Sequence, residues 1–434
     1  MSSIAPRAEA EAPGTREHEP GGGSGLVMDT NRLDTAAAID LLTRMVRLDS
    51  RTETPGESEL AGMLVERMRA LGLDARLQEV SPGRFNAIGV WRGTGEGPSL
   101  MFNGHLDTNP VTEGWTVDPW GGLVDEHFVY GLGVSNMKAG CASYLAAVEA
   151  LISQGVRPKG DVVLTFVVGE LQGGVGTVAM LNSGVRADYF VNCEPTDLGA
   201  LTLHAGAVDF AVELTGVTRH LSKREEAVDA IEAACRLVPR LNAMTFSGAA
   251  SPDHLSVNRA NVGVVRGALS RDFHEWRPPQ VADFVRMSGT ARYAPSQTPD
   301  SVLADITEVL RGVEQEFPGL RATVKRLSEE TGRPEFPAFE ASPDSPVVRA
   351  VNDAYRQVRG EPQPTGALRP CCFFGSDAAH LARQAGMDGV VCGPGGRYNT
   401  MPDERVDLPD YLDMIKMHML TIGTICGTTA AHLD

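Results

Sequence analysis

Hydrophobic and polar positions divide the first part of the chain into alternating predicted helices and strands. Apolar residues recur at helical spacing over 36–48, 57–71 and 139–154. Short apolar runs bounded by turn residues predict strands at 86–91, 99–103, 161–168 and 189–192. This alternation is typical of an α/β domain with a largely parallel sheet, in which active sites lie at the carboxyl ends of the strands.

The pattern changes after residue 206 and predicts a second, smaller domain of the α+β class. Strands are predicted at 208–214, 260–265, 282–293 and 322–327, and helices at 225–237 and 301–315. This β-α-β-β-α-β order forms a unit of a size that folds independently. The chain then returns to the first domain. We therefore expect a larger domain at 29–206 and 331–434, interrupted by the smaller domain at 207–330.

Composition and charge narrow the possible partners and the compartment. Residues 1–28 are rich in Glu, Pro and Gly, and we expect a disordered tail without the apolar core of a signal peptide. No apolar run approaches the roughly 18 residues of a transmembrane helix. The net charge of −17 argues against binding to nucleic acids or anionic membranes. Seven scattered cysteines do not suggest a disulfide framework, so a cytoplasmic protein is expected.

Several motifs with candidate chemical groups occur in order along the chain. The first follows a predicted strand and contains His105 and Asp107, a spacing that can place an imidazole on a metal while a carboxylate orients it. The others are YGLGVSNMK at 130–138, TFVVGELQGG at 165–174, VNCEPT at 191–196, GSDA at 375–378, GPG at 393–395 and PDE at 402–404.

In this order and spacing, the motifs resemble those of the family that contains acetylornithine deacetylase, succinyl-diaminopimelate desuccinylase, aminoacylase-1 and glutamate carboxypeptidase. The resemblance covers roughly residues 30–430. It implies a catalytic domain with two adjacent zinc ions, and a smaller lid domain that closes on the substrate and dimerises. We therefore expect a homodimer joined through its lid domains.

Four residues match functional positions of the family. The resemblance implies that His105 is a zinc ligand, that Asp107 orients it, and that Glu194 is the acidic ligand of the same zinc. Glu170 keeps the position of the general base. These residues are the part of the family's site that this sequence retains.

Three ligand positions of the family carry residues that bind zinc poorly. Asn136 replaces the aspartate that bridges both ions, Leu171 replaces a glutamate ligand, and Thr400 stands at the position of the final histidine. An amide oxygen is neutral and leucine has no donor atom. Since catalytic zinc usually needs three protein ligands, we expect no dizinc centre, with zinc possible only at a single weak site. Replacement ligands are conceivable at Cys371, Cys372, His380 and Cys392.

Other residues are candidates for catalysis or substrate binding. His220 matches the lid histidine that, in the family, reaches the partner's active site and polarises the scissile carbonyl. Arg292 matches a lid arginine of the family, and Arg369 can bind a substrate carboxylate through a bidentate fork. Lys138 and Asn136 lie in the nominal site loop and are also candidates for substrate binding.

Three functions remain open on this basis. In the first, an enzyme acts on an amino-acid-derived or peptide substrate without the dizinc centre. Glu170 would move a proton and His220 would stabilise an oxyanion, in acyl transfer, amide formation or cyclisation, isomerisation or condensation. Plain amide hydrolysis is harder without a metal-bound hydroxide. The second is an amidohydrolase with a single or rearranged metal, and the third is a non-catalytic binding or regulatory subunit.

Overall fold

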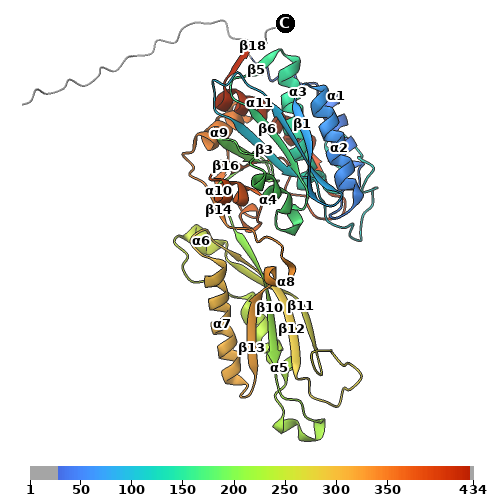
Figure 1. The fold of residues 1–434 in the computed structure, drawn as a ribbon, viewed down its shortest axis with the longest axis vertical. Coiled ribbons are helices and arrows are strands. Elements are labelled where there is room, and N and C mark those ends of the chain that lie inside the picture. The colour runs from blue at the N-terminus through green and yellow to red at the C-terminus, as the bar shows by residue number, and fades with distance from the viewer. Residues whose placement is uncertain (1–27, 431–434) are drawn as a thin grey trace, which may run out of the picture.

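The computed structural model describes residues 28–430 and contains two domains that lie end to end along its long axis (Figure 1). The larger domain is formed by the chain before strand β10 (Gly206–Thr215) and after strand β13 (Arg321–Arg326). The chain between these segments forms the smaller domain. The predicted tail at 1–28 lies outside the described residues, apart from residue 28.

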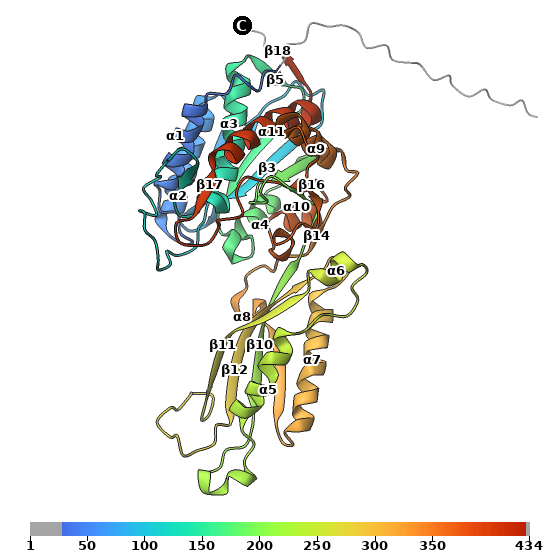
Figure 2. The ribbon, with the colours of Figure 1, turned by 180° about the vertical axis from the view of Figure 1, so that it is seen from behind.

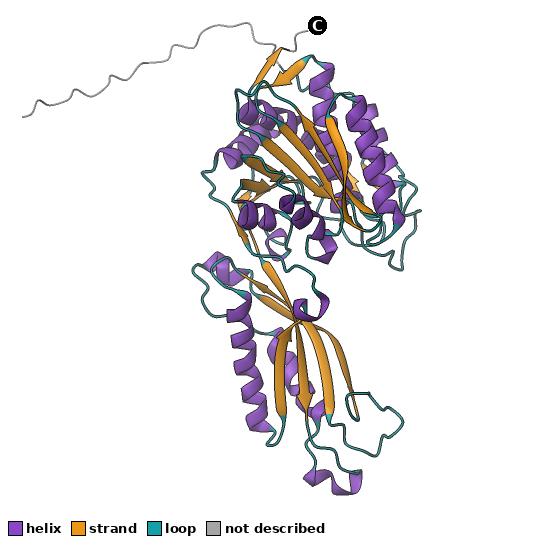
Figure 3. Ribbon diagram, in the orientation of Figure 1, coloured by secondary structure: helices purple, strands orange, loops and turns teal. Residues whose placement is uncertain are grey.

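A mixed eight-stranded sheet forms the centre of the larger domain (Figure 3). In sheet order its strands are β1 (Asp74–Ser81), β2 (Arg84–Trp91), β6 (Val162–Val167), β3 (Leu100–His105), β7 (Tyr189–Asn192), β16 (Asp388–Val391), β8 (Ala200–Leu201) and β15 (Thr365–Gly366). The central strands β6, β3, β7 and β16 are parallel to one another. The predicted α/β class is confirmed, although β1, β2 and β6 pair antiparallel at one edge.

Helices cover both faces of this sheet (Figures 1 and 2). One face packs against α1 (Thr35–Val46), α2 (Pro55–Ala70), α3 (Ala139–Ser153), α9 (Pro346–Arg359) and α11 (Leu408–Cys426), and the other against α4 (Val175–Asn182) and α10 (Ala378–Ala385). Successive residues of β3 alternate between the two faces, since Met101 and Phe102 belong to different buried clusters. Burial on both faces explains why the central strands are continuously apolar in sequence.

Short paired segments complete the larger domain. They are β4 (Phe128–Tyr130) with β17 (Arg405–Asp407), β5 (Val156–Pro158) with β18 (Thr428–Ala430), and β9 (Leu203–His204) with β14 (Phe339–Glu340). Each pair joins chain segments that are far apart in sequence. In the part of the chain that is described, no helix is both long and apolar enough to cross a membrane.

The smaller domain is a four-stranded antiparallel sheet with its long helices on one face (Figures 1 and 2). Its strands lie in the order β11 (Arg259–Ala268), β12 (Phe284–Tyr293), β10 and β13, and its helices are α5 (Ala230–Asn242), α6 (Pro252–Ser256), α7 (Pro299–Glu316) and α8 (Ser328–Thr331). The β-α-β-β-α-β order matches the prediction, with α6 as a short addition. Helix α5 begins later than predicted because the Asp229 carboxylate caps it, accepting hydrogen bonds from the backbone of Ile231 and Glu232.

Candidate active site

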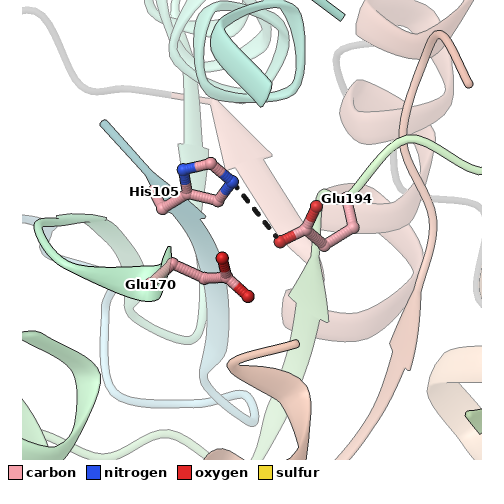
Figure 4. Close-up of side chains that lie close together, drawn as sticks. All are labelled: His105, Glu170 and Glu194. Atoms are coloured by element: carbon pink, nitrogen blue, oxygen red, sulfur yellow. Dashed lines mark ion pairs between the residues drawn. The ribbon is translucent and has the colours of Figure 1, made fainter. Parts of the chain in front are cut away.

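Three side chains from the carboxyl ends of adjacent parallel strands meet in one buried cluster (Figure 4). His105 ends β3, Glu170 begins the short helix η2 (Glu170–Gln172) after β6, and Glu194 follows β7. One nitrogen or oxygen atom from each lies within 4.8 Å of the others. Their exposed fractions are 1%, 6% and 5%. The sheet topology therefore brings together three residues that the motifs selected separately.

Both ring nitrogens of His105 face oxygen acceptors. Its Nδ1 lies 2.8 Å from the backbone carbonyl oxygen of Asp107, and its Nε2 lies 3.2 Å from Oδ1 of Asn136. Nε2 is also 3.7 Å from a carboxylate oxygen of Glu194. Neither the carbonyl oxygen nor Oδ1 carries a proton, so these contacts favour a ring that is protonated on both nitrogens.

The charges of the cluster shift the pKa of each member. Burial opposes the positive charge of His105, but the carboxylates of Glu194, Asp107 and Glu170 outweigh it and raise its pKa to about 10. Burial raises the pKa of Glu170 and of Glu194, and the proximity of His105 partly offsets that rise. The carboxyl group of Glu170 therefore holds a proton more readily than an exposed glutamate does.

Asp377, which directly precedes α10, is a fourth buried acid beside the cluster. Burial raises its pKa to about 7, the positive charge of His105 lowers it, and the charge of Glu194 raises it. Thr177 lies near, but neither carboxylate oxygen of Asp377 has a hydrogen bond of good geometry to any described residue. In the sequence, Asp377 belongs to the motif at 375–378, but the motif alone predicts no role for it. The signal that the sequence offers at this position is an acidic residue between a Gly-Ser turn and a helix.

The carboxylate of Asp107 supports the turn that carries Glu170. Its two oxygens accept hydrogen bonds from the backbone N–H groups of Glu170 and Leu171, both at 3.1 Å. Gly169, with φ of 71°, allows the chain to turn into the site here. The carboxylate lies 3.6 Å from Nδ1 of His105, so the closer contact to the histidine comes from the backbone of Asp107.

Glu404 holds the loop that contains Asn136. Its buried carboxylate accepts hydrogen bonds from the backbone N–H groups of Gly133, Ser135 and Asn136, at 3.1, 2.9 and 2.9 Å. Burial nevertheless raises its pKa to about 7. In the sequence, Glu404 is only the last residue of the motif at 402–404, because its positioning role depends on a contact between distant parts of the chain.

Lys138 is the last residue of η1 (Val134–Lys138), the segment that contains Asn136. Its Nζ donates a hydrogen bond of 2.9 Å to the carbonyl oxygen of Leu48, and its side chain is buried. Burial lowers its pKa to about 8. Lys138 is not among the residues that line the cavity beside Asn136. Its assignment to substrate binding stays a prediction.

Two cavities adjoin the three positions at which the sequence predicts the loss of a zinc ligand. A cavity of about 320 Å³ is lined by Asn136, Thr400 and Glu404, among others. Another, of about 370 Å³, lies between the domains and is lined by Leu171 and Arg292, among others. Asn136 and Thr400 therefore face a common space, whereas Leu171 borders the space between the domains.

The fold and the site match a known family of hydrolytic enzymes. The model of peptidase family M20/M25/M40 matches residues 101–424. The chain belongs to this family. Among curated relatives, an N-formyl-4-amino-5-aminomethyl-2-methylpyrimidine deformylase of Bacillus subtilis (strain 168) is 26% identical over 399 residues, covering 86% of this chain and 89% of the relative. An acetylornithine deacetylase of Proteus mirabilis (strain HI4320) is 27% identical over 369 residues, covering 83% and 88%.

Solved structures of the family share the fold of this member. A tripeptidase from Staphylococcus aureus superposes with a TM-score of 0.72 at 22% identity, over 91% of this chain and 99% of that one. The M20 family metallo-carboxypeptidase Sso-CP2 from Sulfolobus solfataricus gives a TM-score of 0.71 at 16% identity, over 89% and 99%.

Three side chains of the buried cluster can hold one metal ion. His105, Glu170 and Glu194 can supply one ligand atom each to a single ion. Around a second ion, Asn136, Leu171 and Thr400 supply no charged oxygen and no imidazole. The absence of a dizinc centre, expected from the sequence, therefore stays a prediction.

The proposed replacement ligands lie outside the cluster that His105, Glu170 and Glu194 form. His380 Nε2 is 2.9 Å from the carbonyl oxygen of Gly173, to which it donates. The thiols of Cys371 and Cys392 contact the backbone carbonyl oxygens of Pro195 and Leu198. These contacts account for each of the three side chains without a metal.

The lid residues named from sequence lie at opposite ends of the smaller domain. Strand β10 begins beside the larger domain and extends roughly 30 Å from it, at about 3.3 Å for each residue. His220 follows its far end, directly before η3 (Leu221–Glu226), and is exposed. One chain therefore does not bring His220 to Glu170, and its catalytic role stays a prediction that requires a second copy.

Arg292 ends near the cluster, whereas Arg369 lies farther out. Burial lowers the pKa of Arg292, and the charge of Glu170 acts in the opposite direction. Arg369 is exposed, and its guanidinium carbon lies 6.0 Å from the ring centre of Phe373. Both arginines belong to the junction between the domains.

Proposed function

We propose that this family member is an enzyme that acts on an amino-acid-derived or peptide-like small molecule without a dizinc centre. The observation that carries the proposal is the hydrogen bonding of His105. Its Nε2, the atom that would bind a metal, instead faces Oδ1 of Asn136, while Nδ1 is occupied by a backbone carbonyl. A ring held in this way carries a positive charge and stabilises negative charge on a neighbouring group.

Glu170 moves the proton in this mechanism. It lies in the cluster beside His105, and burial raises its pKa, which favours proton transfer by this carboxyl group. Arg292 lies near enough to neutralise negative charge on the substrate. The curated relatives are named as a deformylase and a deacetylase, which supports a substrate with an acyl group on nitrogen. Acyl transfer, amide formation or cyclisation, isomerisation and condensation all suit these groups.

Chelation and metal analysis test whether the enzyme requires a metal. Protein purified without chelator is expected to carry well under one zinc per chain, because three of the family's ligand positions are lost. Turnover is expected to be unchanged after incubation with a chelator and gel filtration. Elemental analysis and activity measured on the same sample check both points, with a zinc-dependent family member as the control.

The second candidate is a deacylase with a single metal. Two observations favour it: the three ligand atoms lie within 4.8 Å of one another, and the buried carboxylate of Asp377 has no hydrogen bond of good geometry to a described residue. His105, Glu194 and Glu170 would hold the ion, which would supply a water of lowered pKa. Loss of activity on chelation and recovery with zinc would establish this function and exclude the first.

We further infer that the protein forms a homodimer through the smaller domain. Strand β11 is an edge strand and exposes Val264 and Val265 to 55% and 50%. A groove of about 390 Å³ beside it is lined by apolar side chains of α5 and β11, including Ile231 and Val238. An antiparallel second copy can pair with the same edge and cover the same groove, since an edge strand is self-complementary.

Light scattering at micromolar concentration is expected to give the mass of a dimer. Val265→Lys places a charge in the apolar edge and is expected to give a monomer, whereas Leu77→Lys, at an exposed residue of the larger domain, leaves the dimer intact. If a second copy delivers His220, the monomeric variant and His220→Ala should both lose on the order of 10²-fold in turnover. A wild-type monomer would contradict the dimer and the role of His220 together.

A further inference from the structure

We propose that Gln172 is a positioning residue, which holds the turn of Glu170 in place and connects it to residues 331–336, by which the chain returns from the smaller domain. The inference rests on the proposed function, in which Glu170 moves the proton. Gln172 does not belong to the buried cluster of His105, Glu170 and Glu194. It acts through the backbone of η2, of which it is the last residue.

The turn that carries Glu170 depends on its neighbours for its shape. Gly169 and Gly173 flank η2 in the left-handed conformation, with φ of 71° and 83°, and a helix of three residues makes few hydrogen bonds of its own. On one side, the carboxylate of Asp107 accepts hydrogen bonds from the first two backbone N–H groups of η2. Gln172 supplies the contacts on the other side. Its side chain is 9% exposed, and both ends of its amide are hydrogen-bonded.

A buried ion pair fixes the first partner of Gln172. The amide oxygen of Gln172 accepts a hydrogen bond of 2.7 Å from Nη1 of Arg84, on β2. The Nε and Nη2 atoms of the same guanidinium donate at 2.9 and 2.8 Å to the two carboxylate oxygens of Glu57, on α2. The side chain of Glu57 is fully buried. Because the two parallel hydrogen bonds fix the plane of the guanidinium, its remaining donor points to Gln172 in a fixed direction.

The second partner of Gln172, Glu53, leads to the segment 331–336. The amide nitrogen of Gln172 donates a hydrogen bond to Oε1 of Glu53, and the same oxygen lies 3.8 Å from Nη2 of Arg333. The backbone N–H of Glu53 donates at 3.0 Å to the carboxylate of Glu57. Glu53 has φ of 63°, a conformation that residues other than glycine adopt only where the surrounding contacts impose it. These contacts therefore hold Glu53 between η2 and Arg333.

The segment 331–336 also packs directly against the end of η2. A Cβ on Gly173 would lie 2.0 Å from the backbone carbonyl oxygen of Pro334, so only glycine permits this approach. One residue farther on, the carboxylate of Glu335 accepts a hydrogen bond of 2.6 Å from the hydroxyl of Ser328, on α8. A displacement of the smaller domain therefore acts on η2 at two points, through Glu53 and through Gly173.

An exchange of two side chains tests the role of Gln172. Gln172→Glu keeps an acceptor for Arg84 but places a carboxylate against that of Glu53, and it should lower kcat roughly 10- to 100-fold with little change in KM, as the loss of a charged hydrogen bond does. Adding Glu53→Gln restores the pair with donor and acceptor reversed, and kcat should return to within about threefold of the wild type. Gln357→Glu, at an exposed residue of α9, is the matched control and should keep full activity.

Hydrogen exchange tests the connection to the returning segment without turnover. In Gln172→Glu, backbone exchange should rise roughly tenfold in both 169–175 and 331–336, and the double variant should reverse both changes. A rise confined to 169–175 would overturn the connection, and a double variant that recovers neither kcat nor exchange would overturn the positioning role. Full activity of Glu170→Gln would overturn the proposed function, whereas the exchange rates would still decide whether Gln172 connects the two segments.

Discussion

Replacement of Glu170 by glutamine is expected to lower turnover roughly 10²–10⁴-fold, the usual contribution of general acid–base catalysis. The amide keeps the size and shape of a side chain that is 6% exposed, but it does not accept the proton. Substrate affinity should change little, since the neutral amide fills the same space beside His105 and Glu194. Steady-state kcat and KM for the substrate give the two effects separately.

Glu126→Gln is the matched control, because this exposed glutamate lies away from the cluster and should retain full activity. A pH–rate profile distinguishes a catalytic role of Glu170 from a structural one. The limb of the profile that reports the raised pKa of Glu170 should disappear in Glu170→Gln. Full activity of this variant would remove Glu170 as the proton carrier. It would also strengthen the interpretation of the protein as a binding or regulatory subunit.

The sequence predicts the fold where periodicity is strong. The order of elements in the smaller domain and the parallel strands β3, β6 and β7 follow from apolar spacing and are present in the structure. Strand β1 was not predicted because most of its residues are at least partly exposed. Strands β8 and β15 have two residues each, too few to show a period, and only contacts between distant segments define them.

The candidate site likewise contains residues that the sequence predicts and residues that only the structure reveals. His105, Glu170 and Glu194 are found by motif because each lies at or just after the end of a strand. Asp377 and Glu404 were missed because their surroundings, rather than their neighbours in sequence, make them notable. Glu404 contacts a loop some 270 residues earlier in the chain.

The sequence also does not show in which direction a side chain points. A lysine in the site loop suggested substrate binding, but the structure directs the ammonium of Lys138 to a backbone carbonyl. Arg259 belongs to no motif, and only the strand register shows that it lies opposite Arg292. Motifs therefore select residues at strand ends, whereas pairing and packing decide which other residues join them.

Restoration of the three missing ligands is expected to rebuild the dizinc centre. The variant that combines Asn136→Asp, Leu171→Glu and Thr400→His should bind about two zinc ions per chain after dialysis against zinc, the number expected once each ion has its protein ligands. The carboxylate introduced at position 136 would lie beside His105, whose Nε2 is 3.2 Å from the present Asn136 oxygen. Elemental analysis and a rise in the thermal unfolding temperature with added zinc measure the outcome.

The positions tolerate these changes for separate reasons. Leu171 is 39% exposed, so a glutamate there loses little hydration. Thr400 has φ of 54°, a conformation that a β-branched residue adopts poorly and a histidine adopts more readily. The control variant carries Leu171→Gln and Thr400→Asn with Asn136 unchanged, so that neutral amides replace the charged and imidazole ligands. Equal zinc content in the two variants would show that these three positions do not determine metal binding. The proposal that the protein lacks a dizinc centre would then be wrong.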